Sequence, residues 1–350
     1  MKFDLSEDQS LLQSSTRDFF VKAFPLEKTR RVMEHDPRGF ERPAWRQIAE
    51  MGYPGLLVPE AMGGQGLGPI ELAVVCEEAG RVCLPGPLFD VQLAAATLAA
   101  AGGHDALVRA VAAGEKIVTI AWRNSAYAGE ARQTTHLAHG RVKGHKYFVP
   151  FAASADALLV TTAEGLALVE GPFEVTPLET IDLAQRFGEV ALDHPATLVG
   201  SLGLLERTDL LAAVGAGATL LGIMTKALEI TVGYLQTRET FKRAIGSFQV
   251  LQHRTADMLL KTESSRSAVY RAAWCLAAND PDTALACATA KAYAGDAARL
   301  VCAEAIQMHG GIGFTWELDV HLYFKRAKTY EMHYGSTEAQ LDRVLAAAGI

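Results

Sequence analysis

The stretch RETFKRAIGSFQVLQHRTADM, residues 238–258, decides the fold class because a long helical pattern stops and restarts within it. We expect one helix from Asp209 to Thr240 and a second from Gln249 to Ala278, joined by a turn that contains glycine. Arg238 and Phe241 are three residues apart, so we expect both side chains to project from one face of the first helix.

Two further long helices are expected in the C-terminal part of the chain, at 282–309 and 336–348. The segment Asn279-Asp-Pro281 breaks the helical pattern, and Asp282 is suited to cap the helix that follows. Gly310-Gly311 is a stop signal at the end of that helix. Long helices joined by short turns predict an antiparallel bundle.

The rest of the chain divides into a helical part and a part with short strands. Up to about residue 115 the pattern is helical, with a capping box at Ser6 and Gln9 and helices near 43–51, 70–83 and 89–101. The strand-like runs that follow are IVTIAW (117–122), YFVPF (147–151), DALLVTTA (156–163), LALVE (166–170) and EVALD (189–193). Short strands without helices between them favour an antiparallel sheet or barrel. The predicted fold is α+β and mostly helical, with domains at 1–115, 116–203 and 204–350.

Bulk composition excludes several classes of protein. A formal net charge of -7 over 350 residues argues against nucleic-acid binding. The longest apolar run, Leu210 to Met224, is shorter than the roughly 20 residues of a membrane span, so we expect a buried core helix. The N-terminus lacks a secretory pattern, and the 5 cysteines contain no CxxC pair. We therefore predict a cytoplasmic protein with reduced cysteines and no metal site.

Two C-terminal stretches carry residues suited to a dinucleotide. A guanidinium (Arg238), an aromatic ring (Phe241) and an amide (Gln249) together match a pyrophosphate with an adjacent adenine. In AIQMHGGIGF, residues 305–314, Gln307 precedes a glycine pair whose backbone can approach a ligand closely. The alternative for each stretch alone is an ordinary helix–turn–helix corner.

The glycine loop GGQGLG at 63–68 lacks the GxGxxG spacing and is interpreted as a flexible loop.

Taken together, these stretches resemble the acyl-CoA dehydrogenase family. The resemblance covers nearly the whole chain and is carried by MGYPGLLVPEAMGGQGLGPIELAVVCEEAGR (51–81), RETFKRAIGSFQ (238–249), IQMHGGIGFTWE (306–317) and YGSTEAQ (334–340). It implies an FAD-dependent fold with an N-terminal helical domain, a middle β-domain and a C-terminal four-helix bundle, assembled as dimers or tetramers. It also implies that the adenine and pyrophosphate of a neighbouring subunit's FAD are contacted by Arg238, Phe241, Gln249, Gln307, Gly310 and Gly311.

The residue expected to start the chemistry is missing from this sequence. In the family a carboxylate removes the α-proton of an acyl-CoA thioester, and a hydride then passes to the flavin. Most members carry that base as Glu immediately before the Gly of the closing loop, where this chain has Tyr334. Other members carry it in the first long C-terminal helix, near Ala212 here. A phenol with a pKa near 10 is only about one part in a thousand ionised at pH 7. The nearest acids, which we expect to point elsewhere or to act as helix-start charges, are Glu206, Asp209, Glu331 and Glu338.

The middle region also departs from the family pattern. Members usually have a Thr-Glu-Pro…Gly-Ser stretch and a Trp-Ile-Thr stretch that cover the flavin ring. The corresponding residues here are AWRNSAYAGE (121–130) and KYFVPFAAS (146–154), in which the expected flavin-binding polar residues are not recognisable.

Three functions remain open from the sequence. The first is a subunit without the base in a heteromeric acyl-CoA dehydrogenase, which completes the FAD site of a Glu-bearing partner and passes electrons to an electron-transfer protein. Family members of that kind often act on bulky acyl-CoAs such as steroid side chains. The second is a homo-oligomeric FAD enzyme that uses Tyr334, a displaced acid or a different flavin reaction. The third is a flavin-free subunit that serves assembly or acyl-CoA binding only.

Overall fold

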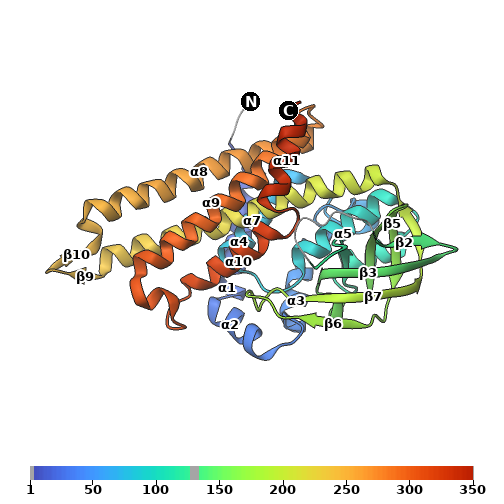
Figure 1. Ribbon diagram of the computed structural model, residues 1–350, viewed down its shortest axis with the longest axis horizontal. Coiled ribbons are helices and arrows are strands. Elements are labelled where there is room, and N and C mark those ends of the chain that lie inside the picture. Colours follow the sequence, from blue (N-terminus) through green and yellow to red (C-terminus); the bar gives the residue numbers. More distant parts are fainter. Residues whose placement is uncertain (1–3, 127–133, 350) are drawn as a thin grey trace. The chain divides into compact units, whose positions relative to one another are not determined.

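The computed structural model describes residues 4–126 and 134–349 (Figure 1). Contacts divide the chain into two compact units. A helical unit comprises Met1–Leu26, Pro69–Leu84 and Ala212–Ile350, and a sheet unit comprises Glu27–Gly68 and Pro85–Leu211. The three predicted domains, at 1–115, 116–203 and 204–350, stay a prediction.

Most of the predicted C-terminal helices are present in the helical unit. The helix α8 has the predicted bounds, whereas α7 begins seven residues before Asp209, directly after the last strand of the sheet unit. The helix α10 is an addition to the prediction. The helices of this unit are α1 (Glu7–Ala23), α4 (Pro69–Arg81), α7 (Leu202–Thr237), α8 (Gln249–Ala278), α9 (Thr283–His309), α10 (Val320–Met332) and α11 (Thr337–Ala347).

Three of the four predicted capping and stop signals are confirmed. Ser6 and Gln9 form the expected capping box, with Gln9 N donating to Ser6 Oγ at 3.2 Å. Asn279 ends α8 in the left-handed conformation, and Gly310 ends α9 with φ +64°. The exception is Asp282, which precedes α9 but accepts no capping hydrogen bond through its side chain.

The sheet unit contains two four-stranded sheets that pack on a shared apolar core. Their strand orders are β1-β4-β5-β8 and β2-β3-β7-β6. Both sheets contribute to the core, for example through Leu158 of β4 and Val142 of β3. Among the described strands of this unit, neighbours pair antiparallel, as predicted, except for β1 and β4. The pairing of β1 with β4 is parallel, which the sequence did not predict.

The bounds of the remaining elements complete the sheet unit. Its helices are α2 (Leu26–His35), α3 (Arg42–Glu50), α5 (Leu88–Ala101) and α6 (Asp105–Ala112). Its strands are β1 (Val118–Ala121), β2 (His136–Ala138), β3 (Arg141–Pro150), β4 (Ala157–Thr162), β5 (Gly165–Glu170), β6 (Val175–Leu178), β7 (Phe187–Pro195) and β8 (Thr197–Gly200). The glycine loop at 63–68 follows a short 3₁₀ turn, Glu60–Met62, and not a strand.

The helix α7 is apolar enough to resemble a membrane span by composition. Its most apolar window has a mean hydropathy of 1.6, but 83% of that window is buried inside the protein. A core helix of a helical unit has the same properties, which agrees with the expectation from the sequence.

Backbone contact between α4 and α7 organises the helical unit. A Cβ atom on Gly222 would overlap the carbonyl oxygen of Glu77, and one on Gly80 would overlap the carbonyl oxygen of Thr219. Only glycine leaves room for this approach, since any side chain would force the helices apart. The crossing carries Glu77 and its neighbour Glu78 into the interior, where each is about 1% exposed.

We therefore predict that Gly222→Ala destabilises the protein by about 3 kcal/mol, because the added methyl group meets rigid backbone. The matched control is Gly233→Ala in the same helix, where an added Cβ meets nothing within 4 Å. That change should stabilise by up to about 1 kcal/mol, through helix propensity alone. Urea unfolding followed by circular dichroism measures both, and equal effects would contradict the proposed crossing.

Candidate functional site

The predicted dinucleotide-binding residues lie together at one corner of the helical unit. At this corner α7 and α9 end and α8 begins (Figure 1). Tyr234, in the last turn of α7, stacks on His309, the last residue of α9, with ring centroids 4.4 Å apart. An ion pair of 3.2 Å between Arg254 and Glu304 ties the first turns of α8 to α9. We call residues 238–249 and 307–311 the bundle corner.

The connection from α7 to α8 is a β-hairpin and not a continuation of the helix. The helix ends at Thr237, and Glu239–Thr240 (β9) then pairs with Arg243–Ala244 (β10). Phe241 and Lys242 form the turn with φ of 54° and 63°, the signature of a tight two-residue hairpin. The expectation that Arg238 and Phe241 share a helix face is therefore wrong, because both lie beyond the last turn of α7.

The hairpin places an aromatic ring in solvent next to cations. The Phe241 side chain is 84% exposed, and its ring lies edge-on to Phe248 at 6.3 Å. The guanidinium of Arg243 lies over the Phe248 ring at 4.0 Å. Phe248 precedes α8 without a capping side chain. The N–H groups of Gln249 and Val250, which belong to the positive end of the α8 dipole, lie at the same corner.

All six residues predicted to bind a dinucleotide are exposed at the bundle corner: Arg238, Phe241, Gln249, Gln307, Gly310 and Gly311. A Cβ atom on Gly310 or Gly311 would meet nothing within 4 Å, so the backbone there is open to a ligand. Exposed guanidinium and amide donors, a free aromatic face and an uncapped helix start are groups that fit a pyrophosphate and an adenine. The role of each residue stays a prediction.

The closing loop holds Tyr334 between α10 and α11. Tyr334 is half-buried, has φ +58° and places its ring 4.2 Å from that of His333. The buried Glu331 three residues earlier binds Lys328 at 2.7 Å, and Glu338 is exposed in the first turn of α11. The loop therefore carries a phenol at the position where we expected a carboxylate from the resemblance.

The other position at which family members carry the base has an apolar residue in this chain. Ala212 is fully buried in α7. Glu206 and Asp209 lie inside this helix and not at its start, because α7 begins at Leu202. The expectation that they are helix-start charges is corrected accordingly.

A buried lysine in the sheet unit was not predicted. Of the stretch 121–130, the residues 127–130 lie outside the described chain. In the described part, Lys146 of β3 donates to Asn124 Oδ1 at 2.5 Å and to Thr161 Oγ1 at 2.7 Å. Its side chain is fully buried, and this burial lowers the pKa of Lys146 to about 7. The period of two from Val142 through Gly144 to Lys146 is the signal that would have revealed an inward-facing lysine.

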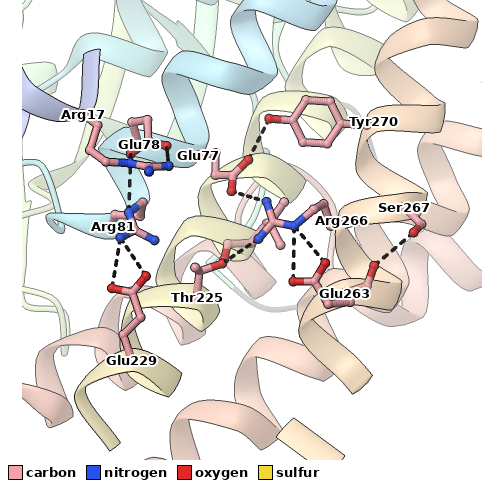
Figure 2. A network of polar contacts seen from close by, with 11 residues as sticks. Arg17, Glu77, Glu78, Arg81, Thr225, Glu229, Glu263, Arg266, Ser267 and Tyr270 are labelled. Carbon is pink, nitrogen blue, oxygen red and sulfur yellow. Dashed lines mark hydrogen bonds and ion pairs between the residues drawn. The ribbon is translucent and has the colours of Figure 1, made fainter. Parts of the chain in front are cut away.

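Figure 2 shows a second group of charged residues, around the buried carboxylates of α4. Arg17 of α1 donates to Glu78 from Nε at 2.9 Å and from Nη2 at 2.7 Å. Burial raises the pKa of Glu78 above its ordinary value, and the bonds from Arg17 oppose that rise. Arg81 extends the group by pairing with Glu229 of α7 at 2.8 Å.

The other carboxylate of the pair binds α8. Glu77 accepts hydrogen bonds from Arg266 and, at 2.7 Å, from the hydroxyl of Tyr270 (Figure 2). Arg266 also pairs with Glu263 at 3.2 Å and reaches Thr225 of α7 at 3.3 Å. Because each carboxylate is matched by a guanidinium, we interpret this network as a structural tie between helices and not as a site for proton transfer.

Comparison with known proteins agrees with this architecture. Residues 6–111 match the acyl-CoA dehydrogenase N-terminal domain, and residues 211–349 match the acyl-CoA dehydrogenase C-terminal domain. The chain belongs to the acyl-CoA dehydrogenase family, whose members bind FAD.

Relatives cover almost the whole chain. The acyl-CoA dehydrogenase IpdE2 of Mycolicibacterium smegmatis is 32% identical over 343 residues, which span 98% of this chain and 99% of that protein. Among solved structures, the Tcur3481-Tcur3483 steroid ACAD G363A variant has a TM-score of 0.90 at 30% identity, covering 98% of each chain. The ChsE4-ChsE5 complex from Mycobacterium tuberculosis has a TM-score of 0.89 at 29% identity, covering 100% of this chain and 99% of that one.

Breaking the pair between α4 and α8 should destabilise the protein without a direct effect on ligands. Arg266→Met leaves Glu77 buried without its guanidinium, and because Arg266 is 31% exposed we expect a loss of about 2 kcal/mol. The control is Arg271→Met on the same helix, whose pair with Asp282 is exposed and long at 3.4 Å. Its effect should stay within about 0.5 kcal/mol. Chemical denaturation tests this, and equal losses would refute the structural role of the network.

Lys146 predicts a specific pH dependence of stability. A lysine titrates near 10.4 when unfolded but near 7 in this fold, so the folded state binds fewer protons between those values. The free energy of unfolding should therefore rise with pH from about 7 to 10, by up to about 1.4 kcal/mol per pH unit from this residue. Urea unfolding of the wild type and of Lys146→Met at pH 7 to 9.5 measures the difference. Lys143→Met, which removes an exposed lysine of the same strand, is the control. If the free energies of unfolding of the wild type and of Lys146→Met differ by the same amount at every pH, the lowered pKa of Lys146 is contradicted.

Proposed function

We propose that this chain is the subunit without a base in a heteromeric acyl-CoA dehydrogenase, and that its bundle corner completes the FAD site of a Glu-bearing partner. The observation that carries the proposal is a contrast within the helical unit. The bundle corner presents exposed donors and an open backbone, whereas the closing loop presents Tyr334 in place of a carboxylate.

The missing carboxylate limits the chemistry of the chain by itself. Removal of an α-proton requires an ionised base beside the α-carbon and shielded from water. A phenol is almost fully protonated at neutral pH. Glu331, the nearest carboxylate before the loop, is held by Lys328 at 2.7 Å. Proton abstraction is therefore assigned to the partner's glutamate.

The bundle corner supplies binding and not bond making. FAD, when bound, would supply the acceptor for the hydride that leaves the β-carbon of the acyl-CoA. Arg238 is suited to pair with the pyrophosphate, and the exposed Phe241 ring is suited to pack on the adenine. The amides of Gln249 and Gln307 supply hydrogen bonds from two different helices, α8 and α9. Gly310 and Gly311 allow a close approach of the backbone.

The relatives support a heteromer and suggest a substrate class. The ChsE4-ChsE5 structure is a complex of two differently named proteins, and the Tcur3481-Tcur3483 variant is a steroid ACAD with a paired name. We propose by analogy that this chain works on a bulky acyl-CoA, such as one with a steroid side chain. We further propose that it does so in the cytoplasm and with an electron-transfer partner.

Exposed apolar side chains of α8 offer surface for assembly with another subunit, namely Val250, Leu259 and Leu260.

A homo-oligomeric enzyme that uses Tyr334 is the second candidate. The observation that favours it is the ring of His333, which lies 4.2 Å from the Tyr334 ring and is buried. Tyr334→Phe separates the two functions. The exchange should abolish turnover if the phenol takes part in the chemistry, and leave the turnover of a heteromeric complex largely unchanged if it does not. A flavin-free assembly subunit is the third candidate.

The test is co-purification with a Glu-bearing acyl-CoA dehydrogenase partner, followed by measurement of bound FAD and of turnover. Arg238→Ala should weaken FAD retention by the complex about tenfold, since a charge-assisted hydrogen bond is lost. Arg271→Ala, which removes an exposed cation near the other end of α8, should leave it unchanged. Unchanged retention with Arg238→Ala would favour the flavin-free candidate. Stoichiometric FAD with full turnover by this chain alone would overturn the proposal.

A further inference from the structure

A buried lysine on α9 binds the closing loop on both sides of Tyr334. Lys291 is fully buried, and its Nζ donates to the carbonyl oxygen of Glu331 at 3.2 Å and to that of Gly335 at 2.9 Å. Glu331 lies in the last turn of α10, and Gly335 lies in the loop that leads to α11. A single amino group thus connects the end of one helix with the start of the next across residue 334.

The conformation that this lysine spans is costly for a tyrosine. Tyr334 has φ +58°, in the left-handed region that disfavours residues with a side chain by about 1–2 kcal/mol. Such conformations persist only where the surroundings determine them. Besides Lys291, Gln340 Nε2 donates to the carbonyl oxygen of Tyr334 at 3.3 Å, and Ser336 Oγ caps α11 by accepting from Ala339 N at 3.3 Å.

The packing of α9 brings the lysine within reach of the loop. Gly295 lies one turn after Lys291, and a Cβ atom there would lie 2.9 Å from Thr337 Oγ1 and 3.3 Å from Glu331 Cγ. The backbone of α9 therefore approaches the loop directly. The negative end of the α10 dipole, formed by its last carbonyl groups, is a favourable place for a lysine that donates hydrogen bonds.

We propose that Lys291 is a positioning residue for the closing loop, which holds residue 334 in the left-handed conformation whatever side chain is present there. The hydrogen bonds that Lys291 makes to Glu331 and Gly335 go to backbone oxygens and not to side chains. The loop thus remains set to present one side chain in a fixed direction, although that side chain is not a carboxylate. The relevance to acyl-CoA chemistry rests on the proposed function, but the positioning itself does not.

The matched control lies in α10, just before the loop. Lys328 binds the side chain of Glu331 at 2.7 Å and makes an ion pair three residues away along α10. Removal of Lys328 therefore deletes a lysine next to the loop without deleting a bond to the backbone around residue 334. A general effect of losing a nearby lysine would appear in both variants, and a positioning effect only in Lys291→Met.

The experiment is amide hydrogen exchange of the chain alone, read on peptides that cover 329–340. Lys291→Met should speed exchange of His333, Ala339 and Gln340 about tenfold, because two buried hydrogen bonds that order the loop are lost. Lys328→Met should change it less than about twofold. Tyr334→Glu by itself should leave exchange as in the wild type, because the bonds from Lys291 to Glu331 and Gly335 go to the backbone.

The decisive comparison asks whether a second substitution restores slow amide exchange to Lys291→Met. Glycine adopts positive φ without a penalty, so adding Tyr334→Gly to Lys291→Met should restore exchange to within about threefold of the wild type. If Lys291 only filled space in the core, Tyr334→Gly would not restore slow exchange.

If Lys291→Met fails to fold, Lys291→Gln, which keeps an N–H donor, is compared with and without Tyr334→Gly. Unchanged exchange in the lysine variant, or fast exchange that persists with Tyr334→Gly, would overturn the inference. Neither result depends on FAD, on a partner or on the proposed function.

Discussion

Contact between the backbones of α4 and α7 is the constraint on which the helical unit depends. Gly80 and Gly222 allow the two helices to touch, and this contact brings the carboxylates of Glu77 and Glu78 into the interior. Buried charges require partners, and guanidinium groups from α1 and α8 supply them. The glycine contact thus places α7 against α4, the pair of Arg266 with Glu77 ties α8 to α4, and the ends of α7 and α8 lie at the bundle corner.

Two parts of the helical unit, one at each end of α9, have opposite characters. The bundle corner is open: the side chains predicted to bind a dinucleotide are exposed, Gly310 and Gly311 have free space, and no side chain caps the start of α8. The closing loop is tightly determined, since Lys291 and Gln340 bind its backbone around a strained residue 334. An open surface rich in donors suits a ligand shared with another subunit. A fixed loop without a carboxylate suits a subunit that shapes a site but does not start the reaction.

The sequence predicted those elements whose signals are local. The bounds of α8 follow from the glycine turn before Gln249 and from Asn279 after its last residue. The helix α10 was missed because the buried Arg326 interrupts its apolar face, and that side chain donates to the distant carbonyl oxygen of Leu84. The hairpin after α7 was missed because Phe241 and Lys242 adopt positive φ without a glycine to announce it. Both misses reflect tertiary contacts or strain, which single-sequence patterns do not report.

We propose that the chain binds the adenine and pyrophosphate of FAD but lacks the carboxylate that removes the α-proton of the acyl-CoA. The most direct test is a titration of the lone chain with FAD, followed by anaerobic addition of acyl-CoA while the flavin absorbance near 450 nm is recorded. The account predicts weak and substoichiometric binding of FAD and no bleaching by acyl-CoA. Tight binding of one FAD per chain, with bleaching within seconds of acyl-CoA addition, would contradict it.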